Sequence, residues 1–207
     1  MQHEQYFART PTSDGAGRTV ELALHDRTAT CATLPGVFSV RGLDKGTAIL
    51  LPELPAPHPG ATCLDLGCGW GPIAMVLGSR EPSATVWATD VNERARALTV
   101  ANARRNGLAN VRVAEPATLP ADLRFDLIAS NPPVRVGRHA LVEMLLDATG
   151  RLTERGAAWL VVSRHLGADS VAADLSAAGR TVERAASKRG FRILRVTLTP
   201  AADRDTP

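Results

Sequence analysis

At 207 residues, 44% hydrophobic and 22% charged, the sequence has the composition of a globular domain that buries about 70% of the surface its unfolded chain would expose. It contains no apolar run long enough to span a membrane, and its first ten residues lack the apolar core of a secretion signal, so we expect a cytoplasmic protein. Three cysteines without Cys-x-x-Cys spacing predict reduced thiols and no metal site, and a net charge of +3 permits a polyanionic partner without requiring one.

The first third of the chain predicts a small unit ahead of the main domain. Residues 1–18 are polar and contain proline and glycine, so we expect a flexible N-terminus. "TVELAL" alternates apolar and polar residues, and "TATCATL" follows after the polar "HDR", which predicts a β-hairpin. Asp44 is a suitable N-cap for a helix that Pro52 would end. We therefore assign residues 19–54 to a hairpin and a helix.

From residue 61 onward, short β-branched runs alternate with amphipathic helices. This alternation predicts an α/β fold with a doubly wound, mostly parallel, seven-stranded sheet over residues 61–199, followed by a disordered tail over 200–207. The expected strands are 61–67, 84–90, 110–114, 125–130, 157–163, 180–186 and 191–198, and the expected helices are 72–80, 92–106, 139–153 and 168–178.

The turn after the first of these strands reads "LDLGCGWGP" and predicts a ligand site, because ligands bind at the carboxyl ends of strands in such sheets. Gly67, Gly69 and Gly71 let the backbone approach a ligand closely, and the next helix offers free N–H groups. A dinucleotide fingerprint would need glycine or alanine where Pro72 stands. The turn suits a ligand with an amino-acid head instead, since Asp65 can face an ammonium group and the loop amides a carboxylate.

The second strand ends in Asp90, 23 residues after Gly67. A carboxylate at this place can accept hydrogen bonds from both hydroxyls of a ribose. Asn92 is the better N-cap for the helix that follows, so Asp90 remains available to a ligand.

The fourth strand, "FDLIAS", is followed by Asn131, Pro132 and Pro133. The prolines lack an N–H and fix their φ angles, so they hold Asn131 on a stiff loop at the end of the strand. Asn131 therefore lies at the carboxyl end of a strand, where sheets of this kind bind ligands.

Residues 36–199 resemble the class I methyltransferases, specifically the small-domain family that includes guanine-N2 methyltransferases of ribosomal RNA. The resemblance is carried by "GVFSVRGLDKGTAILL", "LDLGCGWGP", "ATDVN", "ANARRNG", "FDLIASNPPVRVG" and "SKRGFRIL". It implies S-adenosylmethionine as cofactor and assigns roles by position. The methionine end would contact Asp65, Gly67, Gly69 and Gly71, the ribose Asp90, the adenine Glu115, and the substrate amine Asn131 with Pro132.

Residues around the Asn-Pro-Pro loop are candidates for contact with the substrate. The family often has an aromatic residue after the second proline, where this chain has Val134. Phe38, Phe191 and, ranked after them, Trp70 are therefore the candidates for stacking on the target, and Pro133 and Arg135 for holding it. Basic residues after several strands could meet RNA phosphates; they are Arg135, Arg138, His139, Arg164, His165, Lys188, Arg189 and Arg192.

The sequence therefore predicts an S-adenosylmethionine-dependent N-methyltransferase that acts on the exocyclic amine of a guanine in ribosomal RNA. Two alternatives stay open: an N-methyltransferase of a small molecule or a protein amide, and a non-catalytic RNA-binding module with the same fold. Nothing in the sequence indicates the oligomeric state.

Overall fold

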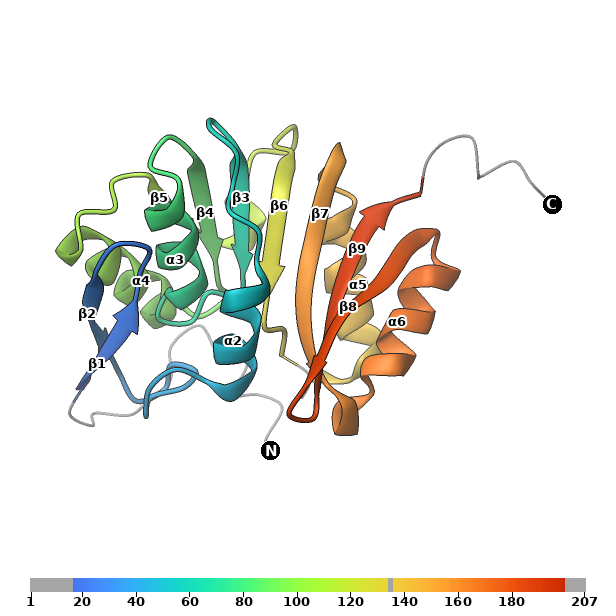
Figure 1. Cartoon of the computed structure of the whole chain (residues 1–207), viewed down its shortest axis with the longest axis horizontal. Coiled ribbons are helices and arrows are strands. Elements are labelled where there is room, and N and C mark those ends of the chain that lie inside the picture. Colours follow the sequence, from blue (N-terminus) through green and yellow to red (C-terminus); the bar gives the residue numbers. More distant parts are fainter. Residues whose placement is uncertain (1–16, 134–135, 200–207) are drawn as a thin grey trace.

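The computed structural model describes residues 17–133 and 136–199. Its main feature is a seven-stranded sheet in the order β5-β4-β3-β6-β7-β9-β8, with a separate two-stranded hairpin (Figure 1). The hairpin strands are β1 (Arg18–Ala23) and β2 (Thr28–Thr33). The sheet strands are β3 (Thr62–Leu66), β4 (Thr85–Thr89), β5 (Val111–Ala114), β6 (Phe125–Ser130), β7 (Leu152–Ser163), β8 (Arg180–Lys188) and β9 (Phe191–Leu198). The predicted doubly wound sheet and N-terminal hairpin are confirmed.

Within residues 17–133 and 136–199, five helices connect or flank these strands. They are α2 (Lys45–Leu50), α3 (Pro72–Arg80), α4 (Glu93–Arg105), α5 (Arg138–Thr149) and α6 (Ala168–Ala177). Short 3-10 turns occupy Leu51–Glu53, Pro116–Thr118 and Arg164–Leu166. As predicted, Asp44 caps α2 by accepting from the Gly46 and Thr47 amides, and a 3-10 turn containing Pro52 follows it.

The strand order places the ends of β3 and β6 side by side. β3 pairs in parallel with both β4 and β6, because the chain moves outward through β4 and β5 and then returns to the other side of β3. This reversal opens a crevice at the carboxyl ends of β3 and β6, the place where sheets of this type bind ligands. In Figure 1 these ends lie along the lower edge of the sheet, and α2 lies near the same edge.

The two faces of the sheet are covered by two separate apolar cores. Successive strand residues point to opposite faces, so Leu127 and Ala129 join one core and Ile128 joins the other. The first core contains residues of the hairpin, α2, α3 and α4, and the second contains residues of α5 and α6. Strands that are buried on both faces have continuous apolar sequences, and this is why they could be predicted from the sequence.

Asn102 of α4 attaches the hairpin to the main domain. Its side chain is 1% exposed and makes three hydrogen bonds. Oδ1 accepts from the Ala32 amide at 2.8 Å, and Nδ2 donates to the carbonyls of Ala32 and Trp70 at 3.0 and 2.9 Å. Because Ala32 belongs to β2 and Trp70 to the glycine turn, one side chain connects the hairpin, α4 and the turn.

The predicted helix 139–153 was too long at its C-terminal end. The helix α5 ends at Thr149, and β7 begins at Leu152, five residues before the predicted strand. The ladder between β6 and β7 is irregular there, since Phe125 pairs with Leu152 but Leu127 pairs with Ala157. Leu152 is an apolar residue that fits a helix pattern, but its buried position comes from strand pairing. Most of the predicted N-terminus and the whole predicted tail lie outside the described residues.

We expect Asn102→Ala to lower the free energy of unfolding by about 2 to 4 kcal/mol, because it leaves buried backbone groups of Ala32 and Trp70 without partners. Urea denaturation would measure the change. Val100→Ala is the matched control, since Val100 lies on the same helix and is 51% exposed; its effect should stay within about 0.5 kcal/mol. Equal effects of the two substitutions would contradict the connecting role of Asn102.

Candidate active site

The glycine turn after β3 has the backbone geometry that its sequence requires. Gly67, Gly69 and Gly71 have φ angles of +77°, +57° and +94°, which residues with a side chain rarely adopt. At Gly71 an added Cβ would also lie 2.8 Å from Thr99 Cγ2. Thr99 donates a hydrogen bond to the Gly69 carbonyl at 3.0 Å. The positive φ angles therefore explain why the turn has glycine at these three positions, and at Gly71 the packing against Thr99 adds a second reason.

Four amides of this turn donate hydrogen bonds within the protein. Those of Gly67 and Cys68 bind the Thr89 carbonyl at the end of β4, that of Gly69 binds Asp90, and that of Gly71 binds the Cys68 carbonyl. The turn is thus fixed by the neighbouring strand before any ligand arrives. Contact between these amides and a ligand carboxylate remains a prediction, and here they are engaged elsewhere.

Asp65 lies inside β3 and is fully buried. One carboxylate oxygen, Oδ2, accepts from the Ala74 amide in the first turn of α3 at 2.9 Å, while Oδ1 has no hydrogen-bond partner among the described residues. Burial raises the pKa of this carboxyl to about 7; the Ala74 amide opposes the rise and the nearby Asp90 adds to it. An unpaired, buried acceptor behind the glycine turn is compatible with the predicted contact to an ammonium group.

Asp90 joins the glycine turn to the start of α4. Its Oδ2 accepts from the Gly69 amide at 3.0 Å and its Oδ1 from the Asn92 amide at 2.9 Å. Burial raises its pKa, against the effect of these two amides and of Arg96. Asn92 caps α4 as predicted, by accepting from the Arg94 amide at 3.0 Å.

Glu115 follows β5 at the same edge of the sheet as Asp90. Arg96 lies between the two acids, since it donates to the Asp90 carbonyl at 2.8 Å and its Nη2 is 3.8 Å from Glu115 Oε2. The predicted ribose and adenine acids are therefore linked through Arg96, which contacts the backbone of one and the side chain of the other. Their contacts with a ligand remain predictions.

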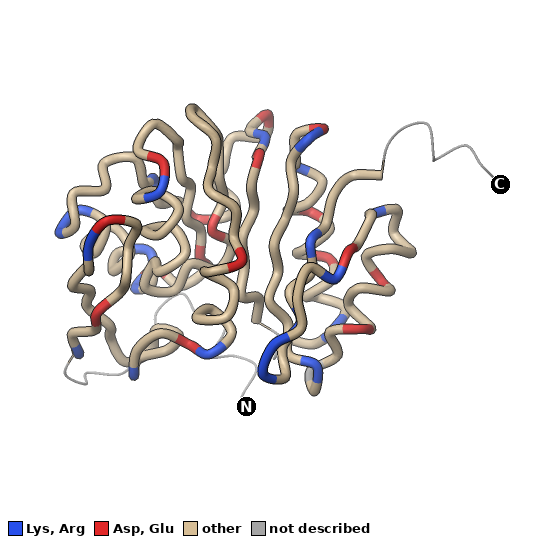
Figure 2. Tube along the Cα trace, in the orientation of Figure 1, with Lys and Arg blue, Asp and Glu red and all other residues tan. Residues whose placement is uncertain are grey.

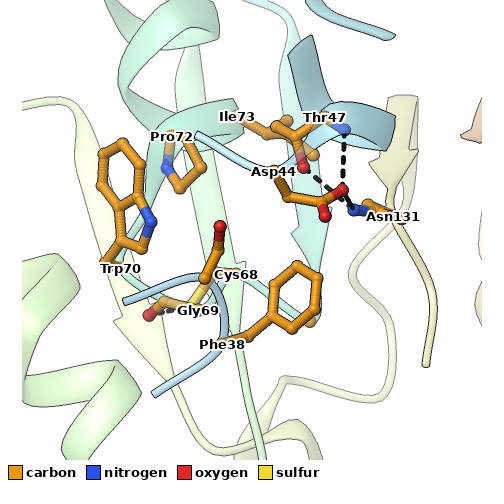
Figure 3. A pocket seen from close by; sticks show the side chains of 11 residues that line it. Phe38, Asp44, Thr47, Cys68, Gly69, Trp70, Pro72, Ile73 and Asn131 are labelled. Atoms are coloured by element: carbon orange, nitrogen blue, oxygen red, sulfur yellow. Dashed lines mark hydrogen bonds between the residues drawn. The ribbon is translucent and has the colours of Figure 1, made fainter. Parts of the chain in front are cut away.

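A small cavity at the ends of β3 and β6 brings the glycine turn and Asn131 together (Figure 3). Its lining also includes Asp44 and Thr47 from the start of α2. The Asn131 Nδ2 atom donates to Asp44 Oδ2 at 2.7 Å and to Thr47 Oγ1 at 3.0 Å. Pro132 is buried behind it. The amide nitrogen of Asn131 is therefore engaged, whereas no hydrogen bond joins its Oδ1 to another described residue. The contact of Asn131 with a substrate amine stays a prediction.

The three aromatic candidates lie in different environments. Phe38 is 56% exposed and lines the same cavity as the glycine turn (Figure 3). Phe191 begins β9 at the same edge of the sheet, but it is partly buried against the core and does not line this cavity. Trp70 also lines the cavity, but it is only 1% exposed and belongs to the core. Of the three, Phe38 is placed to contact a ligand in the cavity.

Several of the predicted RNA-binding cations already have acidic partners. Arg138 makes two hydrogen bonds to Asp174, at 2.6 and 2.9 Å, and Arg192 donates to Asp169 at 2.8 Å. Lys188 is paired with Glu53, and His139 Nδ1 lies 3.3 Å from Glu143 Oε2. These pairs reduce the positive charge that the sequence suggested for the edge of the sheet where the strands carry their carboxyl ends.

Arg164 and Arg189 are exposed, and neither forms an ion pair within the described part of the chain. Their segments are adjacent, because the Arg164 amide donates to the Gly190 carbonyl at 2.9 Å. Figure 2 shows basic residues at the β8–β9 turn on the lower edge of the sheet. Arg135, predicted to hold the substrate, and Val134 lie outside the described residues.

Sequence reasoning recognised Asp44 only as a helix cap and did not identify Thr47 as a site residue. Both precede Asn131 by more than 80 residues, so no local spacing connects them with the Asn-Pro-Pro loop. The available signal was their presence in "GLDKGT", within a segment that the family resemblance included. Only the folded chain brings α2 against the end of β6.

No helix in residues 17–133 and 136–199 is both long and apolar enough to cross a membrane. In the same ranges, no three His, Cys, Asp or Glu side chains are grouped to hold a metal ion.

The raised pKa of Asp65 predicts that stability falls as pH rises. The folded form keeps the Asp65 proton up to about pH 7, whereas an unfolded aspartate releases it near 3.8. The contribution of this proton to the free energy of unfolding is therefore greatest at low pH and is lost as pH rises through 7. Relative to Asp65→Asn, which does not titrate, the wild-type free energy of unfolding should decline between pH 4 and 8, by at most about 4 kcal/mol. Chemical denaturation at fixed pH values measures this. Wild-type and Asp65→Asn proteins whose free energies of unfolding change with pH in parallel would contradict the raised pKa of Asp65.

Comparison with known proteins places this geometry in a family. Residues 28–195 match the family model described as Methyltransferase small domain. The chain is 29% identical over 195 residues to the Bacillus subtilis protein YbxB, covering 93% of this chain and 97% of that protein. It is 35% identical over 176 residues to ribosomal RNA small subunit methyltransferase C of Hahella chejuensis, covering 80% of this chain and 51% of that one. The chain spans about half the length of this second relative.

Solved structures agree on the fold. The T. thermophilus 16S rRNA N2 G1207 methyltransferase, in complex with AdoMet and guanosine, superimposes with a TM-score of 0.75 at 22% identity, over 91% of this chain and 52% of that one. A ribosomal protein L11 methylase from Lactobacillus delbrueckii gives a TM-score of 0.62 at 20% identity, over 74% of this chain and 77% of that one. The family match covers both the glycine turn and the Asn-Pro-Pro loop, so this chain belongs to the methyltransferase small domain family, as an S-adenosylmethionine-dependent methyltransferase of class I fold.

Proposed function

We propose that this enzyme transfers a methyl group to the exocyclic amine, N2, of a guanine in ribosomal RNA. The observation that carries the proposal is the pairing of Asn131, which lines the cavity together with the glycine turn: its nitrogen is bound to Asp44 and Thr47, so its oxygen is the side-chain atom left to accept a hydrogen bond. An acceptor in this place suits a nucleophile that carries N–H groups.

The residues around the cavity fit S-adenosylmethionine. The glycine turn with Asp65 would hold the methionine end, Asp90 the ribose, and Glu115 the adenine. The unpaired oxygen of Asp65 supports this fit, because a buried acceptor without a partner is costly unless a donor reaches it. When bound, S-adenosylmethionine supplies a methyl group activated by a positively charged sulfur.

The chain itself has to orient a weak nucleophile. The lone pair of an amine on an aromatic ring is delocalised, so it attacks poorly until hydrogen bonds fix the amine geometry. The Asn131 oxygen and the Pro132 carbonyl would each accept one N–H, and Pro133 would keep the loop stiff. No strong base is needed, because the nitrogen becomes acidic as it acquires positive charge and then loses its proton to water. Preset geometry of this kind lowers a barrier substantially.

The choice of ribosomal RNA is supported by the relatives and by the surface. Relatives at 35 to 41% identity are named ribosomal RNA small subunit methyltransferase C. Arg164 and Arg189 are exposed at the edge of the sheet that carries the site, where they can contact phosphates. The exposed Phe38 offers a ring for stacking on a base. A ribosomal substrate would place the enzyme in the cytoplasm.

The substrate is tested by following labelled methyl groups into naked 16S and 23S RNA, assembled ribosomal subunits and cell metabolites. We expect label in RNA, and mass spectrometry of the RNA should locate it on guanine N2. Label only in metabolites or protein would overturn the RNA proposal. Calorimetry with S-adenosylmethionine separates an enzyme from a non-catalytic module, which would show no saturable binding.

Asn131→Ala should lower kcat by roughly 100-fold, because it removes one preorganised polar group from the reacting centre. The Kd for S-adenosylmethionine should stay nearly unchanged. Steady-state kinetics and calorimetry measure the two quantities. Val100→Ala is the control, since this exposed side chain lies on α4 and does not line the cavity. A large loss of cofactor affinity in Asn131→Ala would contradict its assignment to the substrate side.

A further inference from the structure

The hydrogen bonds of Asn131 define which of its side-chain atoms a substrate can use. An amide can turn its oxygen or its nitrogen toward a ligand, and the two atoms have opposite hydrogen-bonding character. In this structure the nitrogen is 2.7 Å from Asp44 Oδ2 and 3.0 Å from Thr47 Oγ1. Both contacts come from one short segment at the start of α2.

The carboxylate of Asp44 decides the orientation chemically. An ionised carboxylate only accepts hydrogen bonds, so the atom of Asn131 that faces it must be the nitrogen. The same Oδ2 also accepts from the Gly46 and Thr47 amides, at 2.7 and 3.3 Å. Those backbone donors fix the carboxylate at the N-terminus of α2. Turning the amide would place two oxygens against each other and leave the Thr47 hydroxyl without this donor.

The surrounding packing leaves this arrangement little freedom. Thr47 is 4% exposed. An added Cβ at Gly46 would lie 3.0 Å from Asp44 Oδ2 and 3.1 Å from Asn131 Oδ1, so the absence of a side chain there permits the close approach. The helix α2 packs against β7 and β9, which fixes its position relative to the end of β6. Figure 3 shows Asp44 and Thr47 converging on Asn131 from the same helix.

We propose that Asp44 and Thr47 are positioning residues for the methyl transfer: they take both N–H groups of Asn131 and so present its oxygen to the substrate, which restricts the nucleophile to groups that donate a hydrogen bond. This inference rests on the proposed function. It gives a part in selecting amines to a helix that is distant from the Asn-Pro-Pro loop in the sequence but contacts Asn131 in the structure.

Thr47→Val and Thr47→Ser form a matched pair. Valine preserves the size and the branched shape but removes the hydroxyl, whereas serine keeps the hydroxyl. With naked 16S RNA as substrate, Thr47→Val should lower kcat roughly 5-fold to 10-fold, the effect of one lost hydrogen bond, and leave the Kd for S-adenosylmethionine unchanged. Thr47→Ser should stay within about 2-fold of the wild type. Equal turnover in the two variants would overturn the role of Thr47.

Asp44→Ser tests the charged partner. Serine can still cap α2 but is too short to reach Asn131, so the helix should persist while the orienting contact is lost. Because the lost bond is charge-assisted, kcat should fall further, roughly 10-fold to 100-fold. Thermal unfolding of the same variant checks that the fold survives. Unchanged kcat in a folded Asp44→Ser protein would overturn the proposal.

A substrate-free measurement separates this inference from the proposed function. In ¹⁵N NMR spectra of the wild-type protein, the Asn131 side-chain amide protons should exchange slowly with water, and their exchange should become faster in Thr47→Val but not in Thr47→Ser. Fast exchange in the wild type, or identical exchange in all three proteins, would overturn the orienting contacts. Slow exchange in a protein that methylates no amine would instead overturn the proposed function alone.

Discussion

The contact between Asn131 and Asp44 is the interaction on which the site depends, because it joins two parts of the chain 87 residues apart. Asn131 is set by the end of β6 and by two prolines, and Asp44 by the N-terminus of α2. The contact forms only when α2 packs on the sheet and its capping carboxylate reaches the amide. The same carboxylate therefore caps a helix and holds the Asn131 nitrogen, and the fold determines both contacts.

The other half of the site is organised by a different constraint. The glycine turn is fixed by Thr89, Asp90 and Thr99, which come from β4, its end and α4. Its ligand-binding capacity therefore depends on the correct register of the β3–β4 pair. The buried Asp65 lies beneath the turn with one oxygen unpaired, which is a local cost that an isolated domain tolerates when the free group serves a ligand. If Asp65 contacts the cofactor as proposed, stability and binding compete at this residue.

The sequence predicted those features that local patterns encode. Continuous apolar runs marked the strands, Asn92 and Asp44 marked helix starts, and the glycines marked the turn. The end of α5 was missed because Leu152 continues the apolar spacing of a helix while pairing with Phe125 in the sheet. The part of Thr47 in the site was missed because it depends on long-range packing. The ion pairs of Arg138 and Arg192 were also missed, since charge spacing in a sequence does not show which acid a folded chain places beside each arginine.

Those ion pairs have a consequence for how the protein would meet a polyanion. An arginine already matched with aspartate must exchange that partner for a phosphate, so the gain in electrostatic energy is the difference between two contacts rather than a whole new one. Fewer counterions would leave the nucleic acid than a count of cations suggests, and the affinity would depend less steeply on salt. Such a surface disfavours indiscriminate adhesion to any RNA backbone. Under the proposed function, discrimination would then rest on the shape of the cavity and on the one nucleotide that enters it.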